Sequence, residues 1–158
     1  MTCLPTVPAY PDHAWHGQAE VMENVQVAEA TYRIRLAASE IARRVVPGQF
    51  LMVRLPGQND PLLGRPLAMY DVISDTAGDD VAVDVVYLVV GRVTSRLAEL
   101  RPGTRLELWG PLGNGFSVQP TEHLIMVAGG IGQTPFLALG REMLGQRRFG
   151  RPPRDVAP

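Results

Sequence analysis

Apolar and polar side chains alternate in short runs along the first two thirds of the chain. In the clearest run, from Thr31 to Leu36, a tyrosine, an isoleucine and a leucine alternate with two arginines. A period of two residues is typical of a strand with one buried face. Comparable runs are separated by Pro-Gly turns and polar breaks. The predicted strands are Glu20–Val27, Thr31–Leu36, Phe50–Leu55, Pro66–Ile73, Val81–Val90 and Thr104–Trp109.

The fifth run, Val81–Val90, is rich in β-branched residues and predicts a central strand that is covered on both faces. After it, Thr94 can cap a short helix that continues to Leu100. Six short strands with one helical excursion predict a mainly β fold, a six-stranded antiparallel barrel.

The pattern changes after the turn-rich bridge Gly110–Phe116. Leu124–Ala128 predicts a buried strand, which leads directly into the glycine turn Gly129–Gly132. Thr134, followed by a proline, predicts the start of a helix that ends near Leu144. A strand, a glycine turn and a helix open a parallel α/β nucleotide-binding domain, but only 26 residues follow the turn. We therefore expect this domain to be truncated.

These patterns divide the chain into three expected parts. Residues 1–16 predict an irregular N-terminal segment, residues 17–118 the barrel, and residues 119–158 the truncated nucleotide-binding domain with its tail. The tail, from Arg147 to Pro158, is rich in proline and arginine, and we expect it to be exposed.

Composition narrows the function classes. Hydrophobic residues make up 46% of the 158 residues, which supplies a core and excludes disorder as the main state. The 15 basic residues are all arginines, and 16 acidic residues bring the formal charge to −1, so no polybasic footprint for nucleic acid is present. The longest apolar runs are far shorter than the roughly 18 residues of a membrane span, and no secretory signal opens the chain. We expect a cytoplasmic protein with no nucleic-acid or membrane partner.

Metal chemistry is not expected in this sequence. Its single cysteine, Cys3, excludes an intrachain disulfide, a structural zinc set and an iron–sulfur ligand set. The three histidines lack metal-ligand spacing. We predict no metal ligands and no catalytic side chain.

Arg65-Pro66-Leu67-Ala68 is the first of three segments suited to a nucleotide cofactor. A guanidinium can hold a phosphate through paired hydrogen bonds. The proline fixes the chain so that neighbouring backbone groups can lie against a flat ring. The alternative is an arginine that is solvated or ion-paired at the start of a strand.

The second segment leads from Val86-Tyr87-Leu88 to Val93-Thr94. A helix N-terminus offers free N–H groups to a diphosphate, and the Thr94 hydroxyl adds a donor. Tyr87 could line an adenine or ribose pocket, or it could pack inside the barrel as a structural aromatic residue.

The third segment is Gly129-Gly130-Ile131-Gly132. It is similar to a phosphate-cradling turn, but Pro135 stands where the dinucleotide-binding motif has its third glycine. The alternative is a tight connection from strand to helix that binds no ligand.

Taken in order and spacing with the Gly-Pro-Leu-Gly-Asn-Gly-Phe bridge, these segments resemble the ferredoxin-reductase-type flavoproteins. The bridge is most similar to that of the electron-transfer subunits of type 1B dihydroorotate dehydrogenases. The resemblance extends from about Gln18 to Leu144.

The resemblance implies a six-stranded Greek-key barrel that binds FAD, followed by a nicotinamide-nucleotide domain. It implies that Arg65, Pro66, Leu67 and Ala68 hold the flavin and its diphosphate, that Val86, Tyr87 and Leu88 form a second FAD contact, and that Val93 and Thr94 lie at the phosphate end. In the family, electrons pass between a partner's flavin, an iron–sulfur centre and a nicotinamide. The implied partner is the catalytic subunit of a dihydroorotate dehydrogenase, in a hetero-oligomer that serves pyrimidine synthesis.

The sequence departs from the family at three places. Ala68 replaces a serine or threonine whose hydroxyl can bond flavin N5, so we expect a change in redox tuning more than in binding. Val93 replaces a glycine, which predicts a reshaped diphosphate turn. The family's four-cysteine cluster for a [2Fe–2S] centre and the rest of the NAD domain are absent from this sequence, so we expect neither iron–sulfur binding nor activity of this chain alone.

Two other functions remain open from the sequence. One is a ferredoxin-reductase-type component that serves a different partner, such as a sulfite reductase, a hydrogenase or an oxygenase. The other is an inactive flavin-binding or noncatalytic fragment. Partner identity separates the first from a dihydroorotate dehydrogenase component, and retention of flavin tests the second.

Overall fold

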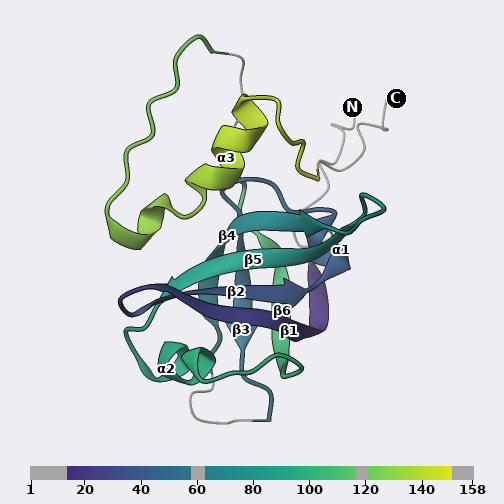
Figure 1. Ribbon diagram of the computed structural model, residues 1–158, viewed down its shortest axis with the longest axis vertical. Coiled ribbons are helices and arrows are strands. Elements are labelled where there is room, and N and C mark those ends of the chain that lie inside the picture. Colours follow the sequence, from purple (N-terminus) through teal and green to yellow (C-terminus); the bar gives the residue numbers. More distant parts are fainter. Residues whose placement is uncertain (1–13, 58–62, 117–120, 151–158) are drawn as a thin grey trace, which may run out of the picture.

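Six antiparallel strands close into a barrel in the computed structural model, which describes residues 14–57, 63–116 and 121–150 (Figure 1). Around the barrel, neighbouring strands follow the order β1-β2-β5-β4-β3-β6. The strands are β1 (Trp15–Ala28), β2 (Thr31–Ala37), β3 (Phe50–Arg54), β4 (Arg65–Ser74), β5 (Asp80–Leu88) and β6 (Arg105–Leu112).

This order confirms the predicted antiparallel barrel. Strands β3, β4 and β5 follow one another as a meander, and β2 lies beside β5. Four strands in this arrangement form a Greek key. Closure leaves the barrel without an exposed edge between β1 and β6.

Two strands extend beyond their predicted ends. β1 begins at Trp15, inside the segment expected to be irregular, because Trp15 and His16 pair with Gly110 and Trp109 of β6. β6 in turn continues to Leu112, into the predicted bridge. Local sequence does not show this pairing, since the partner residues lie far apart in the chain. Residues 1–13 of the predicted N-terminal segment lie outside the described residues.

The core lies inside the barrel and follows the alternation of the strands. Side chains at every second position of the central strands are fully buried. The largest of them are Ile34, Leu36, Leu51, Met69, Tyr87, Leu106 and Leu108.

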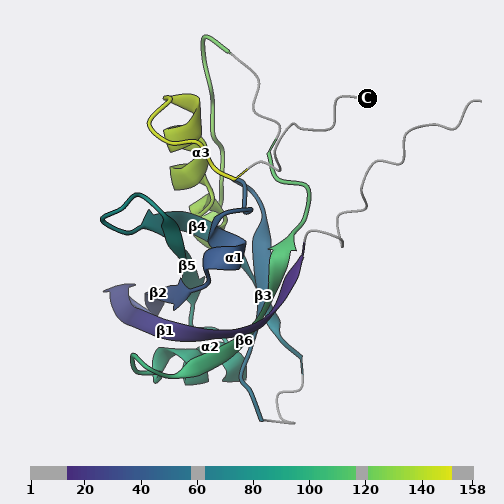
Figure 2. The ribbon, with the colours of Figure 1, turned by 90° about the vertical axis from the view of Figure 1, so that its right-hand side faces the viewer.

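Two short helices close the ends of the barrel (Figure 2). The sequence did not predict α1 (Ser39–Ala42), which follows β2 and buries two of its four residues. The predicted short helix forms as α2 (Arg92–Ala98), but Gly91 and not Thr94 is its N-cap residue. Thr94 lies one turn further on, and its hydroxyl oxygen accepts the Gly91 N–H at 3.1 Å. It therefore still satisfies a donor at the helix start.

The bridge after β6 is held against the turn that precedes β3. The Phe116 N–H donates to the Pro47 carbonyl (2.7 Å), and the Gln49 side-chain amide donates to the Gly113 carbonyl (2.8 Å). Gly115 has φ +71°, and a Cβ atom there would lie 2.6 Å from a methyl carbon of Val46. A glycine is thus required where the bridge crosses the turn.

The predicted strand Leu124–Ala128 is wrong. Residues 122–129 have no regular secondary structure, and Ile125 and Val127 are 86% and 85% exposed. A strand needs neighbours to bond its backbone, and none of the described strands lies beside this segment. The apolar run therefore has no sheet to join.

The predicted glycine turn and helix do form, with shifted limits. The turn is a short 3-10 helix, η2 (Gly130–Gln133), which contacts β5. The helix that follows is α3 (Phe136–Met143), and its N-cap residue is Pro135, not the predicted Thr134. In the two ribbon views α3 lies over β4 (Figures 1 and 2).

Ion pairs and an aromatic side chain fasten the α3 region to the barrel. Arg141 of α3 pairs with Asp71 of β4, and Arg147 pairs with Asp80 at the start of β5. Phe149 is buried with the core, so the expected exposed tail does not begin at Arg147. Residues 151–158 of that tail lie outside the described residues.

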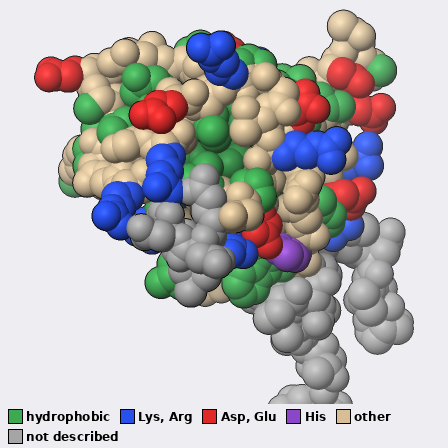
Figure 3. All heavy atoms as spheres, turned by 90° about the horizontal axis from the view of Figure 1, so that it is seen from below, with side chains coloured by type: hydrophobic (Ala, Val, Ile, Leu, Met, Phe, Trp, Pro, Cys, Tyr) green, Lys and Arg blue, Asp and Glu red, His purple; other side chains and the backbone are tan. Residues whose placement is uncertain are grey.

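The end of the molecule that carries α2 has a mixed surface. Seen from below, arginines and acidic side chains are interspersed there with hydrophobic ones (Figure 3). Val90, beside α2, is 77% exposed. The described residues of this face therefore form no broad field of one charge.

Candidate functional site

The ladder between β4 and β5 stops partway along the two strands. It runs from the Ser74–Asp80 pair to the Met69–Val85 pair, and no pair beyond Val85 is found in these two described strands. Past that point, Arg65–Ala68 pair only with β3, and the last residues of β5 pair only with β2. The space between Arg65–Ala68 and Val86–Leu88 is called the slot below. Both segments that the sequence predicted for FAD contact thus form its edges.

The β4 edge directs backbone groups into the slot. In an antiparallel ladder, residues alternate between those bonded to one neighbour and those that point to the other side. The Met69 N–H donates to the Gln49 carbonyl of the β3 side (3.0 Å). By the alternation, the N–H of Ala68 and the carbonyl of Pro66 point away from β3 and toward the slot.

The β5 edge does the same from the opposite side. The Val89 N–H donates to the Ala30 carbonyl on the β2 side (2.7 Å). The preceding residue, Leu88, therefore turns its N–H and its carbonyl toward the slot. These N–H and C=O groups have no strand partner, so a slot with such edges is suited to a flat molecule that carries donors and acceptors along its rim.

Arg65 stands at the exposed end of the slot. Its guanidinium contacts the carbonyls of Leu63 and Gly64 at 3.4 and 3.3 Å, at the long limit for a hydrogen bond. No acidic side chain pairs with it in the part of the chain that the structure describes. Within residues 14–57, 63–116 and 121–150 the guanidinium thus forms no ion pair, and it is exposed to an incoming anion.

The structure places Leu67 and Tyr87 inside the barrel and not in the slot. Tyr87 is 1% exposed, its hydroxyl donates to Asn24 at 3.1 Å, and its ring stacks on Tyr32 with centroids 5.8 Å apart. Asn24 also donates to the Leu97 carbonyl of α2 at 2.8 Å. Tyr87 thus joins the end of β5 to α2, and only its backbone borders the slot.

Val93 and Thr94 lie in α2, beyond the end of β5. Val93 is buried and helical, and among the described residues only Ala30 is a non-glycine with positive φ. The expected conflict between a valine and a left-handed turn therefore does not arise. The Thr94 hydroxyl donates to the Gly91 carbonyl at 3.0 Å, so it is occupied within the helix start.

The glycine turn is exposed and lies near β5. Gly130 has φ +54°, a conformation that favours glycine, and a Cβ atom at Gly129 or Gly132 would meet no neighbour. Ile131 is 41% exposed. The turn is thus open to a ligand but holds no buried pocket of its own.

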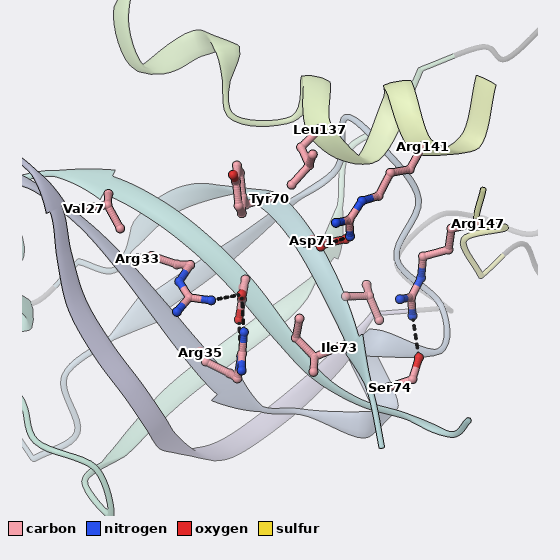
Figure 4. Close-up of a pocket in the computed structure, with 12 residues that line it drawn as sticks. Val27, Arg33, Arg35, Tyr70, Asp71, Ile73, Ser74, Leu137, Arg141 and Arg147 are labelled. Atoms are coloured by element: carbon pink, nitrogen blue, oxygen red, sulfur yellow. Dashed lines mark hydrogen bonds and ion pairs between the residues drawn. The ribbon is translucent and has the colours of Figure 1, made fainter. Parts of the chain in front are cut away.

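A cleft of about 730 Å³ opens between α3 and the outer face of β2, β4 and β5 (Figure 4). It begins where the slot ends, because Tyr70 and Asp84 are next to the last ladder pair. Ligand sites of small molecules commonly have this size. Its floor is lined by Arg33, Arg35, Tyr70 and Asp84, and its α3 side by Leu137 and Arg141.

Asp84 organises the floor of the cleft, although no sequence motif pointed to it. It lies within the apolar run of β5, is 2% exposed, and accepts hydrogen bonds from Arg33 (3.0 Å) and Arg35 (2.8 Å). Glu23 pairs with Arg33 from β1 at 2.7 Å. The hydrogen bond to Asp84 raises the pKa of the Arg35 guanidinium. The sequence signal for Asp84 was the pair of arginines on one face of β2. Partly buried arginines need an acidic partner on a neighbouring strand, and Asp84 is the acidic residue within the apolar run of β5.

Comparison with known proteins gives the class to which this fold and site belong. Residues 18–116 match the family model described as the oxidoreductase FAD-binding domain. This match covers most of the chain and all six strands except the first residues of β1. The chain belongs to the oxidoreductase FAD-binding domain family.

Curated relatives are electron transfer subunits of dihydroorotate dehydrogenase B (NAD(+)). The chain is 39% identical to that of Desulforamulus reducens over 126 residues, which covers 79% of this chain and 47% of the relative. It is 34% identical to that of Clostridium acetobutylicum, covering 78% and 47%. The chain spans about half the length of the curated relatives it matches.

Solved structures share the fold. The NADH-dependent reduced ferredoxin-NADP oxidoreductase superposes with a TM-score of 0.70 at 23% identity, over 80% of this chain and 44% of that one. A cytochrome P450 reductase from Amycolatopsis gives 0.69 at 25% identity, over 84% and 40%. Both comparisons support the barrel assignment.

Neither a membrane-spanning helix nor a group of metal ligands is present among the described residues. No described helix is long and apolar enough to cross a bilayer. Nor do the described histidine, cysteine and acidic side chains include three that are grouped for a metal ion.

Burial raises the pKa of Tyr87 to about 12, from an ordinary value of 10.0. The unfolded chain loses this proton first, so the stability from the neutral, buried phenol is complete below pH 10 and is lost as the pH rises toward 12. Between these limits we expect the free energy of unfolding to fall by roughly 2 kcal/mol more in the wild type than in Tyr87→Phe. Urea unfolding of both proteins across this range measures the difference. If the free energy of unfolding fell equally with pH in the two proteins, the raised pKa of Tyr87 would be contradicted.

Proposed function

We propose that this chain binds FAD, with the isoalloxazine ring seated at the slot between β4 and β5. The observation that carries the proposal is the ladder that ends at Met69 and Val85, with the two family-matched segments on either side of the gap. Bound there, FAD supplies a ring that accepts and releases electrons singly or in pairs.

The backbone of the slot is suited to the polar rim of such a ring. An isoalloxazine carries carbonyl oxygens and ring nitrogens along one side, and these need both donors and acceptors. The Ala68 N–H and the two backbone groups of Leu88 offer both kinds from opposite edges. Ala68 has no hydroxyl, so its backbone N–H is the donor that this residue can offer. We therefore expect that alanine, in place of the family's serine or threonine at position 68, alters the reduction potential of the flavin while FAD binding is retained.

The diphosphate of FAD is assigned to the exposed end of the slot. Arg65 is exposed and free of an acidic partner within the described residues, and a guanidinium binds phosphate through charge-assisted hydrogen bonds. Helix α2 begins at Arg92, shortly after β5 ends at Leu88. The first N–H groups of a helix have no hydrogen-bond partner within that helix. Val93 and Thr94 would then act through their backbone.

We further propose that the barrel serves an electron-transfer subunit whose partner is a dihydroorotate-oxidising subunit. The names of the curated relatives support this role. In the proposed division, residues 17–118 hold FAD and residues 119–158 contribute Gly129–Gly132 to an NAD site. Cys3 alone cannot ligate a [2Fe–2S] cluster, so any such cluster would be held by cysteines outside this sequence.

Removing the guanidinium tests the FAD site. Arg65→Ala should raise the dissociation constant for FAD roughly 10- to 100-fold, because a charge-assisted hydrogen bond is lost. Arg105→Ala, which removes an exposed arginine from β6, a strand that β3 separates from β4, is the matched control and should bind FAD like the wild type. The dissociation constants of the wild type and the two variants are measured by titrating each flavin-free protein with FAD and following the flavin fluorescence. Equal affinities for Arg65→Ala and the wild type would reject this diphosphate site.

Co-purification tests the proposed partner. A tagged copy of the chain, expressed with its genome's dihydroorotate-oxidising subunit and with an oxygenase component, should retain the former. The retained complex should show flavin reduction when dihydroorotate is added. Retention of the oxygenase component alone would assign the barrel to a different electron-transfer chain.

A further inference from the structure

A β-bulge lies at the point where β4 and β5 separate. The ladder pairs Met69 with Val85 and then Asp71 with Asp84, so Tyr70 has no residue opposite it. Bulges end strand pairing and redirect a side chain, and they are frequent beside active sites. The fold therefore places an aromatic residue, with an altered direction, at the inner end of the slot.

Tyr70 stands in the cleft and not in the core. It is partly exposed, whereas its neighbours Met69 and Asp71 are buried. Figure 4 shows the ring rising from β4 toward α3, with Leu137 beside it. Its hydroxyl makes no hydrogen bond to any residue that the structure describes. The side chain is thus not explained by a structural contact of its polar group.

Among the residues that line the cleft, Tyr70 is the only aromatic one. Four other described rings contact one another, since Tyr32 stacks on Tyr87 and Phe116 packs on Phe136. Two residues of a strand span roughly 7 Å, so the phenol ring of Tyr70 can extend back over the position of Ala68. Flat rings pack favourably at centroid separations of about 4.5–7 Å.

From this geometry we propose that Tyr70 packs on the face of the flavin ring that is turned toward α3, and so positions the ring at the slot. The inference rests on the proposed FAD site and adds a residue that neither the sequence motifs nor the resemblance assigns. The bulge turns the Tyr70 side chain toward α3, the cleft leaves space beside it, and its ring is available to contact the flavin.

Three variants test this role. Tyr70→Leu removes the ring and Tyr70→Phe retains it, while Trp109→Leu removes a half-exposed ring from β6, outside the cleft. Dissociation constants are measured for FAD and for riboflavin, which has the ring but no diphosphate. Accessibility of the bound flavin is measured by iodide quenching of its fluorescence, and the melting temperature of each flavin-free protein is recorded.

Tyr70→Leu should raise both dissociation constants by a similar factor, roughly two- to tenfold, the size expected for one aromatic contact. It should also increase iodide quenching, while Tyr70→Phe and Trp109→Leu match the wild type in both measurements. Equal losses for FAD and riboflavin identify a contact to the ring, because a disturbed diphosphate site would weaken FAD alone.

Two results would overturn the inference. One is a Tyr70→Leu protein with wild-type affinity and quenching. The other is a loss that Tyr70→Phe shares and that follows the melting temperature, which would make Tyr70 a structural residue. If the wild-type chain binds neither FAD nor riboflavin, the proposed function fails first, and this outcome is distinct from the other two.

Discussion

Backbone N–H and C=O groups are strong hydrogen-bonding groups, and the site depends on one place where the barrel leaves them without a strand partner. Between β4 and β5 the ladder ends at Met69 and Val85 although both strands continue. Opening a ladder costs the bonds that the missing pairs would make, each worth about 1 kcal/mol net. A ligand that restores those bonds recovers this cost, so the same feature that weakens the empty barrel favours a flat, polar cofactor.

The surroundings keep the two edges apart and in place. On one side, Gln49 accepts the Met69 N–H and its side chain also holds the bridge at Gly113. On the other, Asp84 draws Arg33 and Arg35 onto the outer face of the sheet, next to the point of separation. Asp84 is buried, so these hydrogen bonds are what satisfies its carboxylate there. The position of each edge is therefore set by the strand it pairs with, β3 for β4 and β2 for β5.

Strand periodicity predicted the barrel because one buried face is enough to show the alternation, and the motif at Arg65 predicted one edge of the slot. What the sequence did not show depends on contacts between distant residues. Trp15 joins β1 only because β6 lies beside it, and Asp84 is tolerated in an apolar run only because two arginines of β2 reach it. The apolar run at Leu124–Ala128 failed as a strand for the same reason, since periodicity reports a buried preference and not the presence of a partner.

Hydrogen exchange of backbone amides with and without FAD tests the central claim most directly, because the claim concerns backbone groups. Saturating FAD should slow exchange in peptides that contain Ala68 and Leu88, which face the slot. Peptides from the β1–β6 side of the barrel, around Gln18 and Glu107, should exchange at the same rate in both states. Binding of FAD with unchanged exchange at Ala68 and Leu88, and with protection elsewhere, would contradict the account.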